Sequence, residues 1–154
     1  MPLSRDAIAA ALFTRLSSKV TLCKTFSRKW LEAQQVPIEQ QPALLCLEGS
    51  ETPHEMHDDQ ELPPVWTLEF AVVVYARTND TPIPGKVLSD ILDQIEGALE
   101  RSNTEGGMPG RYHTTLGIQN VQRVWIAGAV QKEDGMETGG QAWMSLPIHI
   151  LAVP

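Results

Sequence analysis

The segment from residue 65 to residue 77 constrains the fold more than any other part of the sequence. Its even-numbered residues are all apolar, whereas its odd-numbered residues include Thr67, Glu69 and Arg77. An alternation with a period of two residues is typical of a β-strand that buries one side against a core. The chain is therefore expected to form a sheet with one apolar face, and other elements must cover that face.

Two amphipathic helices are predicted to provide this cover. Residues 84–101 repeat apolar side chains at the 3.6-residue period of an α-helix, from Val87 to Leu99, and place acidic side chains outside that stripe. Residues 5–17 also repeat apolar side chains at helical spacing, and Ser4 can cap their first turn. Both segments can therefore pack an apolar side onto the sheet.

The other regular segments are predicted to be strands. The first is expected to lie at an edge, because prolines follow it, and a polar loop is expected over residues 49–64. Residues 131–140 are rich in Gly and acidic residues and are predicted to form a hairpin loop. The predicted strands cover residues 25–30, 43–48, 65–77, 120–130 and 141–153.

This order of elements predicts an α+β fold in a single domain over residues 1–154. Two helices would pack on one face of a mostly antiparallel sheet of four to five strands. The other face is expected to be polar or to bind partners. Four tryptophans fall at strand-like positions; core packing is expected for at least half, and any that are exposed are candidate interface anchors. They are Trp30, Trp66, Trp125 and Trp143.

The composition predicts an ordinary soluble protein. The chain has 42% hydrophobic residues, and its apolar runs are far shorter than the roughly 20 residues of a membrane span. No export signal is recognised, so we expect a cytoplasmic protein. Cys23 and Cys46 are too few for a disulfide framework and are predicted to be buried, reduced thiols.

Charge is distributed unevenly along the chain. Residues 30–76 contain nine acidic residues and no Lys or Arg, whereas the first 29 residues have a charge of +5. The net charge of −7 argues against binding nucleic acid through its phosphates, which requires a concentrated basic surface. It leaves open a protein through which DNA passes without adhering.

One loop carries the residue types of a metal site. His54, His57 and Asp58 are candidate ligands for zinc or manganese, but their spacing lacks the HExxH separation that places two imidazoles on one helical face. A solvated acidic loop is the preferred interpretation, with no metal and no other cofactor. The sequence also lacks a GxSxG elbow, a Walker-type loop, a GxGxxG motif and a CxxC pair, so we predict that the protein is not an enzyme.

The order of segments resembles a known family. SRDAIAAALFTRL, TFSRKW, QQPALLCLEG, PPVWTLEFAVVVYA, VLSDILDQIEGAL, VWIAGAV and LPIHILAV follow one another as in the tail terminator, or tail completion, proteins of siphophages and their prophages. The resemblance implies a ring, usually of six subunits, that caps the head-proximal end of the tail tube, ends its polymerisation and joins it to the head. It implies no catalytic residues.

The resemblance also implies partners and a location. The chain would contact itself, the tail tube protein and the head–tail connector or neck proteins, and DNA would pass through the lumen without sequence-specific binding. It would assemble in the host cytoplasm, reside in the tail or neck of the virion and bind no membrane. Alternative functions are another neck or connector protein, a metal-dependent hydrolase that uses the His54 and His57 loop, or a small-ligand-binding module.

The uneven charge suggests how copies could meet. The basic N-terminal region of one subunit is predicted to contact the acidic 48–61 loop of the next, or that loop is predicted to line the lumen. The candidate contact residues are Arg28, Lys29, Glu51, Glu55, Asp58, Asp59 and Glu61.

Overall fold

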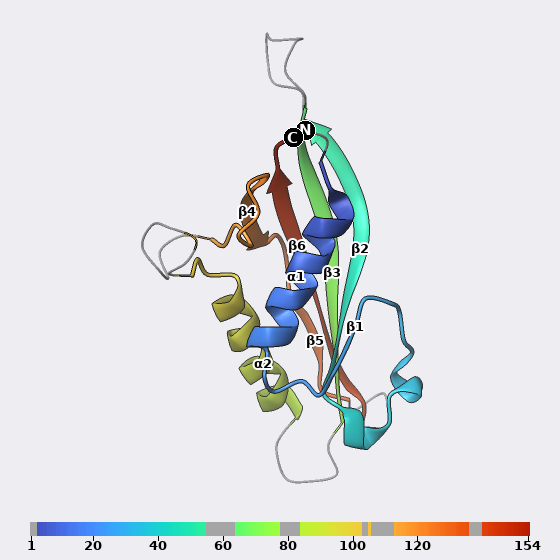
Figure 1. Cartoon of the computed structure of the whole chain (residues 1–154). Coiled ribbons are helices and arrows are strands. Elements are labelled where there is room, and N and C mark those ends of the chain that lie inside the picture. Colours follow the sequence, from blue (N-terminus) through green and yellow to red (C-terminus); the bar gives the residue numbers. More distant parts are fainter. Residues whose placement is uncertain (1–2, 55–63, 78–83, 103–104, 106–112, 136–139) are drawn as a thin grey trace.

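The computed structural model describes residues 3–54, 64–77, 84–102, 105, 113–135 and 140–154. Within these residues two helices lie on one face of a single sheet, and this arrangement confirms the predicted α+β fold (Figure 1). Two short 3-10 turns, Ala33–Gln35 and Ile38–Gln40, lie between the first two strands. The helices and strands in chain order are α1 (Arg5–Lys19), β1 (Thr25–Ser27), β2 (Ala43–His54), β3 (Val65–Ala76), α2 (Pro84–Ala98), β4 (Val121–Ile126), β5 (Gln131–Glu133) and β6 (Ala142–Ala152).

The sheet has six strands in the order β1-β2-β3-β6-β4, with β5 also paired to β6. All neighbours are antiparallel except β1, which is parallel to β2 and lies at the edge as predicted. The strand count exceeds the expected four to five because the segment predicted as one strand, 120–130, forms only β4. A second strand, β5, begins at Gln131, where a hairpin loop was predicted, and that part of the loop prediction was wrong.

Pro147 of β6 explains the interruption between β4 and β5. In an antiparallel strand the N–H and C=O of one residue point to the same neighbour. The Pro147 carbonyl accepts a 3.0 Å hydrogen bond from Ala127 N, so the side on which proline lacks a donor is also the β4–β5 side. The ladder is therefore weakened at this point. It resumes where Gln131 pairs with Ser145.

A β-bulge extends β2 into the segment predicted as a loop. Two residues, Gly49 and Ser50, lie opposite the single residue Glu69 of β3, and pairing then continues to His54. A Cβ atom at Gly49 would lie 3.1 Å from the Glu69 carbonyl oxygen, so this position has little room for a side chain. The extra residue reverses the alternation. Thr52 and His54 therefore lie on the face away from the helices.

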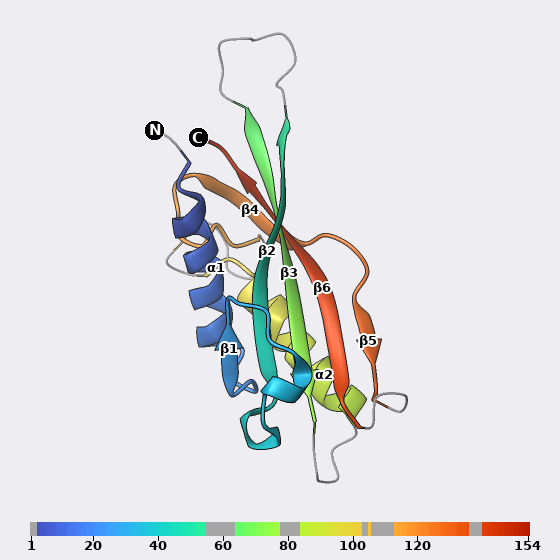
Figure 2. The ribbon, with the colours of Figure 1, turned by 90° about the vertical axis from the view of Figure 1, so that its right-hand side faces the viewer.

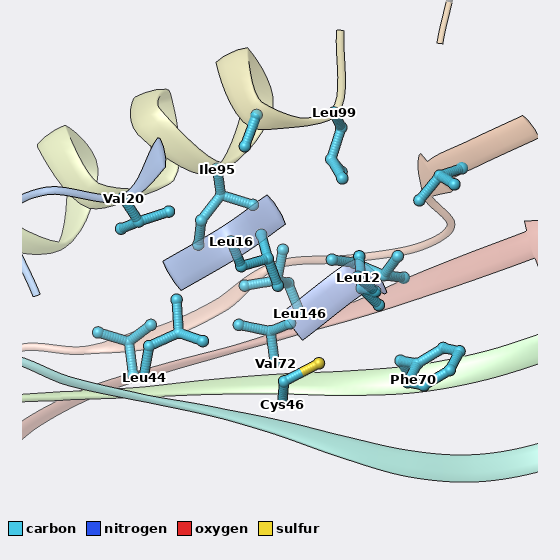
Figure 3. Packing of buried hydrophobic residues seen from close by; sticks show 14 of the residues in the cluster. Leu12, Leu16, Val20, Leu44, Cys46, Phe70, Val72, Ile95, Leu99 and Leu146 are labelled. Atoms are coloured by element: carbon cyan, nitrogen blue, oxygen red, sulfur yellow. The ribbon is translucent and has the colours of Figure 1, made fainter. Parts of the chain in front are cut away.

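The main core fills the space between the helices and the sheet. Figure 3 shows Leu12 and Leu16 of α1 and Ile95 of α2 above Val72 and Leu146 of the sheet. The even-numbered side of β3 faces this core as predicted. Both helices end differently from the predictions, because α1 continues to Lys19 and α2 ends at Ala98. None of the described helices has the length and apolar character needed to span a membrane.

The opposite face of the sheet is only partly covered. The segment between β1 and β2 packs Val36 onto Leu45, Val73 and Tyr75, and the Tyr75 hydroxyl donates a 2.9 Å hydrogen bond to the Leu31 carbonyl. Figure 2 shows this segment in front of the lower half of the sheet, whereas no described element lies in front of the upper half. Part of the face expected to be polar or available to partners is thus a second, small core.

Candidate interaction surface

The upper part of this face has no covering element among the described residues, and we call it the open face. Its side chains come from four strands and are mostly half-buried. Apolar and polar residues alternate across it, so it lacks the dense apolar character of the main core. The open face consists of Leu47, Thr52 and His54 of β2, Thr67, Glu69 and Ala71 of β3, Arg123 and Trp125 of β4, and Pro147, His149 and Leu151 of β6; Leu47 lies at its border, where it also packs against the second core.

One row of side chains crosses three strands of the open face. Glu69 and Trp125 lie on either side of His149 in the strand register. His149 Nε2 is 3.7 Å from Glu69 Oε1, and its ring meets the Trp125 ring edge to face with centroids 5.7 Å apart. The Arg123 guanidinium lies 4.7 Å from the centroid of the Trp125 ring. The row therefore has a carboxylate at one end and a guanidinium at the other.

This row presents charged groups on the surface of the sheet. Its opposite charges are both accessible, since the Glu69 side chain is 41% exposed and Arg123 is exposed. A protein surface with the complementary order of charges could meet both ends of the row.

Two of the charged residues proposed for subunit contacts, Arg28 and Glu51, already have partners within the chain. Arg28 Nη2 lies 2.9 Å from Asp6 Oδ1 and 3.6 Å from Glu48 Oε2. Glu51 Oε2 lies 2.5 Å from Arg5 Nε. The basic N-terminal region and the start of the acidic segment therefore attract each other within one subunit. Exposed pairs of this kind contribute at most about 1 kcal/mol each.

The remaining predicted contact residues are less informative. Lys29 is exposed after β1. Glu55, Asp58, Asp59 and Glu61 lie outside the described residues, so their predicted roles stay predictions.

The proposed metal ligands are not brought together in the described part of the chain. His54 lies at the end of β2, where its Nε2 is 2.7 Å from Thr67 Oγ1. His57 and Asp58 lie outside the described residues. No group of three or more His, Cys, Asp or Glu side chains with metal-binding geometry occurs among the residues that are described.

Both cysteines are buried and free, as predicted. Burial in the core raises the pKa of each thiol to about 12. The reactive thiolate is therefore scarce at neutral pH. Neither residue has the properties of a nucleophile.

The sequence reasoning missed a buried ion pair between α1 and Glu105, a residue that follows α2. The Glu105 side chain is 3% exposed and lies 2.8 Å from Arg15 Nη2 of α1. It also accepts hydrogen bonds from the Thr114 hydroxyl and the Ser102, Thr115 and Gly117 backbone amides.

Burial alone would raise the pKa of Glu105, but the hydrogen bonds from Thr114, Ser102 and Arg15 and the charge of Arg15 lower it to about 2. No local pattern could reveal the pair, since its two charges are 90 positions apart in the chain.

The tryptophans divide as expected. Trp66 packs against the main core and Trp143 against the second core, which confirms core packing for half of the four. Trp30 is 53% exposed and follows β1, with its ring edge-on to Tyr75 at 6.5 Å. Its indole N–H donates a 2.9 Å hydrogen bond to Glu32. Trp30 therefore remains a candidate interface anchor.

Comparison with known proteins yields a structural likeness. No protein-family model matches the sequence, and no curated protein sequence matches it. The fold is similar to that of a chain in the virion of the native gene transfer agent (GTA) particle, with a TM-score of 0.55 and 10% sequence identity. The match covers 96% of this chain and 95% of that chain. At this identity the likeness is one of fold.

Proposed function

We propose that this chain is a structural protein of a phage-like particle. The observation that carries the proposal is the fold that it shares, over 96% of its length, with a chain of a gene transfer agent virion. The agreement extends over 95% of that chain as well, so it concerns a whole architecture and not a common supersecondary unit. The order of the sequence segments resembles that of the tail terminator proteins and supports the same proposal.

Within such a particle, the proposed role is that of a tail terminator. Six copies form a ring on the head-proximal end of the tail tube, end its polymerisation and provide the surface that joins the head. The partners are other copies of the chain, the tube protein and the neck or connector proteins. The chain assembles in the host cytoplasm and remains in the virion, and it has no catalytic role.

The electrostatics of the chain suit a ring through which DNA passes. The net charge is −7, and four acidic residues cluster between β2 and β3. Acidic side chains around a lumen repel the phosphates of DNA and keep it from adhering. We therefore propose that Glu55, Asp58, Asp59 and Glu61 line the lumen. The alternative of a contact with the basic region of a neighbour is less favoured, because Arg28 already pairs with Asp6 and Glu48.

Deletion of the gene from the particle that encodes it tests the role directly. A protein that ends tube polymerisation leaves tubes of uncontrolled, excessive length when it is absent. Another neck or connector protein would instead leave tubes of normal length that fail to join heads. Electron microscopy of lysates distinguishes these outcomes, and normal, infectious particles would refute both roles.

The mass of the purified chain provides a second test. Light scattering over a concentration series should detect a hexamer of about 102 kDa, six times the 17.0 kDa chain. Metal analysis of the same sample tests the alternative hydrolase. A strict monomer with one tightly bound zinc or manganese ion would contradict the ring and support a metal site that includes His54.

A further inference from the structure

Two strands of the sheet, β2 and β4, each have backbone groups on one side without a strand partner among the described residues. β1 pairs only with Ala43–Leu45, so no described strand pairs with the outer edge of β2 from Cys46 onward, although the Arg28 side chain reaches Glu48 there at 3.6 Å. β4 pairs with β6 on one side only. In Figure 1 the upper half of β2 borders one side of the molecule, and β4 lies beyond β6 on the other side. Free edges of this kind are templates for pairing with another chain.

The directions of the strands make these two edges compatible. β2 is antiparallel to β3, β3 to β6, and β6 to β4, so β2 and β4 run in opposite directions. A second copy placed beside the first in the same orientation therefore brings its β4 antiparallel to β2. Copies related by a rotation axis that runs along the strands have this relation, which is the heterologous contact that generates a ring.

The side chains at the edges limit the register of such a pairing. The bulge at Gly49 and Ser50 and the proline at position 53 disrupt regular pairing further along β2. Regular pairing is thus confined to Cys46–Glu48. Leu47 and Trp125 are half-buried apolar residues of the open face at the two edges, although one side of Leu47 already packs against the second core. Pairing them across the junction buries both on the same face.

This register also brings opposite charges together. With Leu47 opposite Trp125, Arg123 of the second copy lies opposite Gly49, which has no side chain to obstruct it. The next residue across the sheet on the open face is Glu69, whose carboxylate is 41% exposed. The row that runs from Glu69 to Arg123 in one copy would therefore continue into the Glu69 of its neighbour.

We propose that a second copy of this chain docks edge to edge, with its β4 antiparallel to Cys46–Glu48 of β2 and its Arg123 paired to Glu69. The proposal deepens the proposed function, because it identifies the interface of the ring. It also explains why the open face has a carboxylate at one end of the row and a guanidinium at the other.

Charge exchange tests the interface in the full-length protein. Glu69→Arg alone and Arg123→Glu alone each place like charges at the junction and should weaken self-association about tenfold or more. The double variant E69R/R123E restores opposite charges and should associate as the unchanged protein does. An equal mixture of the two single variants should also associate, because each edge then meets its complement. Glu96→Arg on the exposed side of α2 is the matched control and should have no effect.

Hydrogen exchange measures the backbone pairing independently of the charges. Peptides that cover residues 43–48 and 121–126 should become protected together as concentration rises. Association of the unchanged protein without this protection would overturn the strand pairing.

Two further results would overturn the proposed interface. In the first, neither single variant weakens ring formation more than Glu96→Arg does. This outcome would leave the tail terminator role standing. The other is a chain that stays monomeric up to millimolar concentration. The gene deletion then tests the tail terminator role separately.

Discussion

Replacement of Glu105 by Gln should remove a large fraction of the stability of the fold at neutral pH. The carboxyl has its pKa lowered from an ordinary value of 4.5 to about 2 by its hydrogen bonds and by Arg15. One pKa unit corresponds to about 1.36 kcal/mol, so the ionised side chain contributes roughly 3 kcal/mol. The amide of the variant would have no negative charge to pair with Arg15. Its own N–H groups would also lie against the hydroxyl and backbone N–H groups that donate hydrogen bonds to the carboxylate.

The sign of the pH dependence follows from the lowered pKa. The contribution is present above the ordinary pKa of 4.5 and is lost as pH falls from 4.5 toward about 2, where the folded protein binds the proton. The difference in unfolding free energy between the unchanged protein and Glu105→Gln should therefore be roughly 3 kcal/mol at pH 7 and should shrink toward pH 2. A melting temperature about 6–12 °C lower is expected at neutral pH for a chain of this size.

Urea unfolding followed by tryptophan fluorescence measures this difference at a series of pH values. Glu96→Gln on α2 is the control, because its exposed side chain should change stability by less than about 0.5 kcal/mol. A loss below about 1 kcal/mol for Glu105→Gln at pH 7 would contradict the reasoning. A loss that stays constant between pH 3 and pH 7 would contradict it as well, because the pH dependence comes from this carboxyl.

Two further predictions concern glycine and cysteine. Gly135 has a φ of +91° and an added Cβ would lie 2.8 Å from the Gly140 carbonyl carbon, so Gly135→Ala should destabilise the protein by about 1–3 kcal/mol in thermal unfolding. Gly97→Ala in α2, where nothing lies within 4 Å, should instead stabilise it by about 0.5–1 kcal/mol, and equal effects at both positions would be inconsistent with the structure. The thiols of Cys23 and Cys46, with pKa values of about 12, should react with a disulfide reagent at pH 8 only after denaturation, and rapid labelling of the native protein would show that the core is not closed over them.

The main elements of the fold were predictable because their signals are local. The alternation in residues 65–77 identifies β3 and its buried side, and the apolar stripe of residues 84–101 identifies α2 within three residues at its end. Burial of one side of each element imposes these patterns at short range. The same reasoning placed the cysteines in the core. It also assigned β1 to the edge, since prolines after a strand do not fit a central position.

The predicted strand boundaries were wrong where a neighbouring strand, and not the local sequence, decides how far a strand extends. Residues 49–54 are polar and carry turn residues, yet they continue β2 because β3 provides a partner along their whole length. The bulge at Gly49 and Ser50 then changes which side chains face the open side. The division between β4 and β5 falls opposite Pro147, a residue of the neighbouring strand that the sequence of residues 120–130 does not reveal.

Sequence alone thus determined the class of fold, the buried sides of its elements, the buried thiols and the uneven distribution of charge. Each of these follows from the residue itself and its near neighbours in the chain. Tertiary structure decided which charges meet. It paired Arg15 with Glu105 and Arg28 with Asp6, and it aligned Glu69, His149 and Trp125 across three strands. Such contacts join residues that are distant in the chain, and only the register of the strands and the packing of the helices bring them within reach.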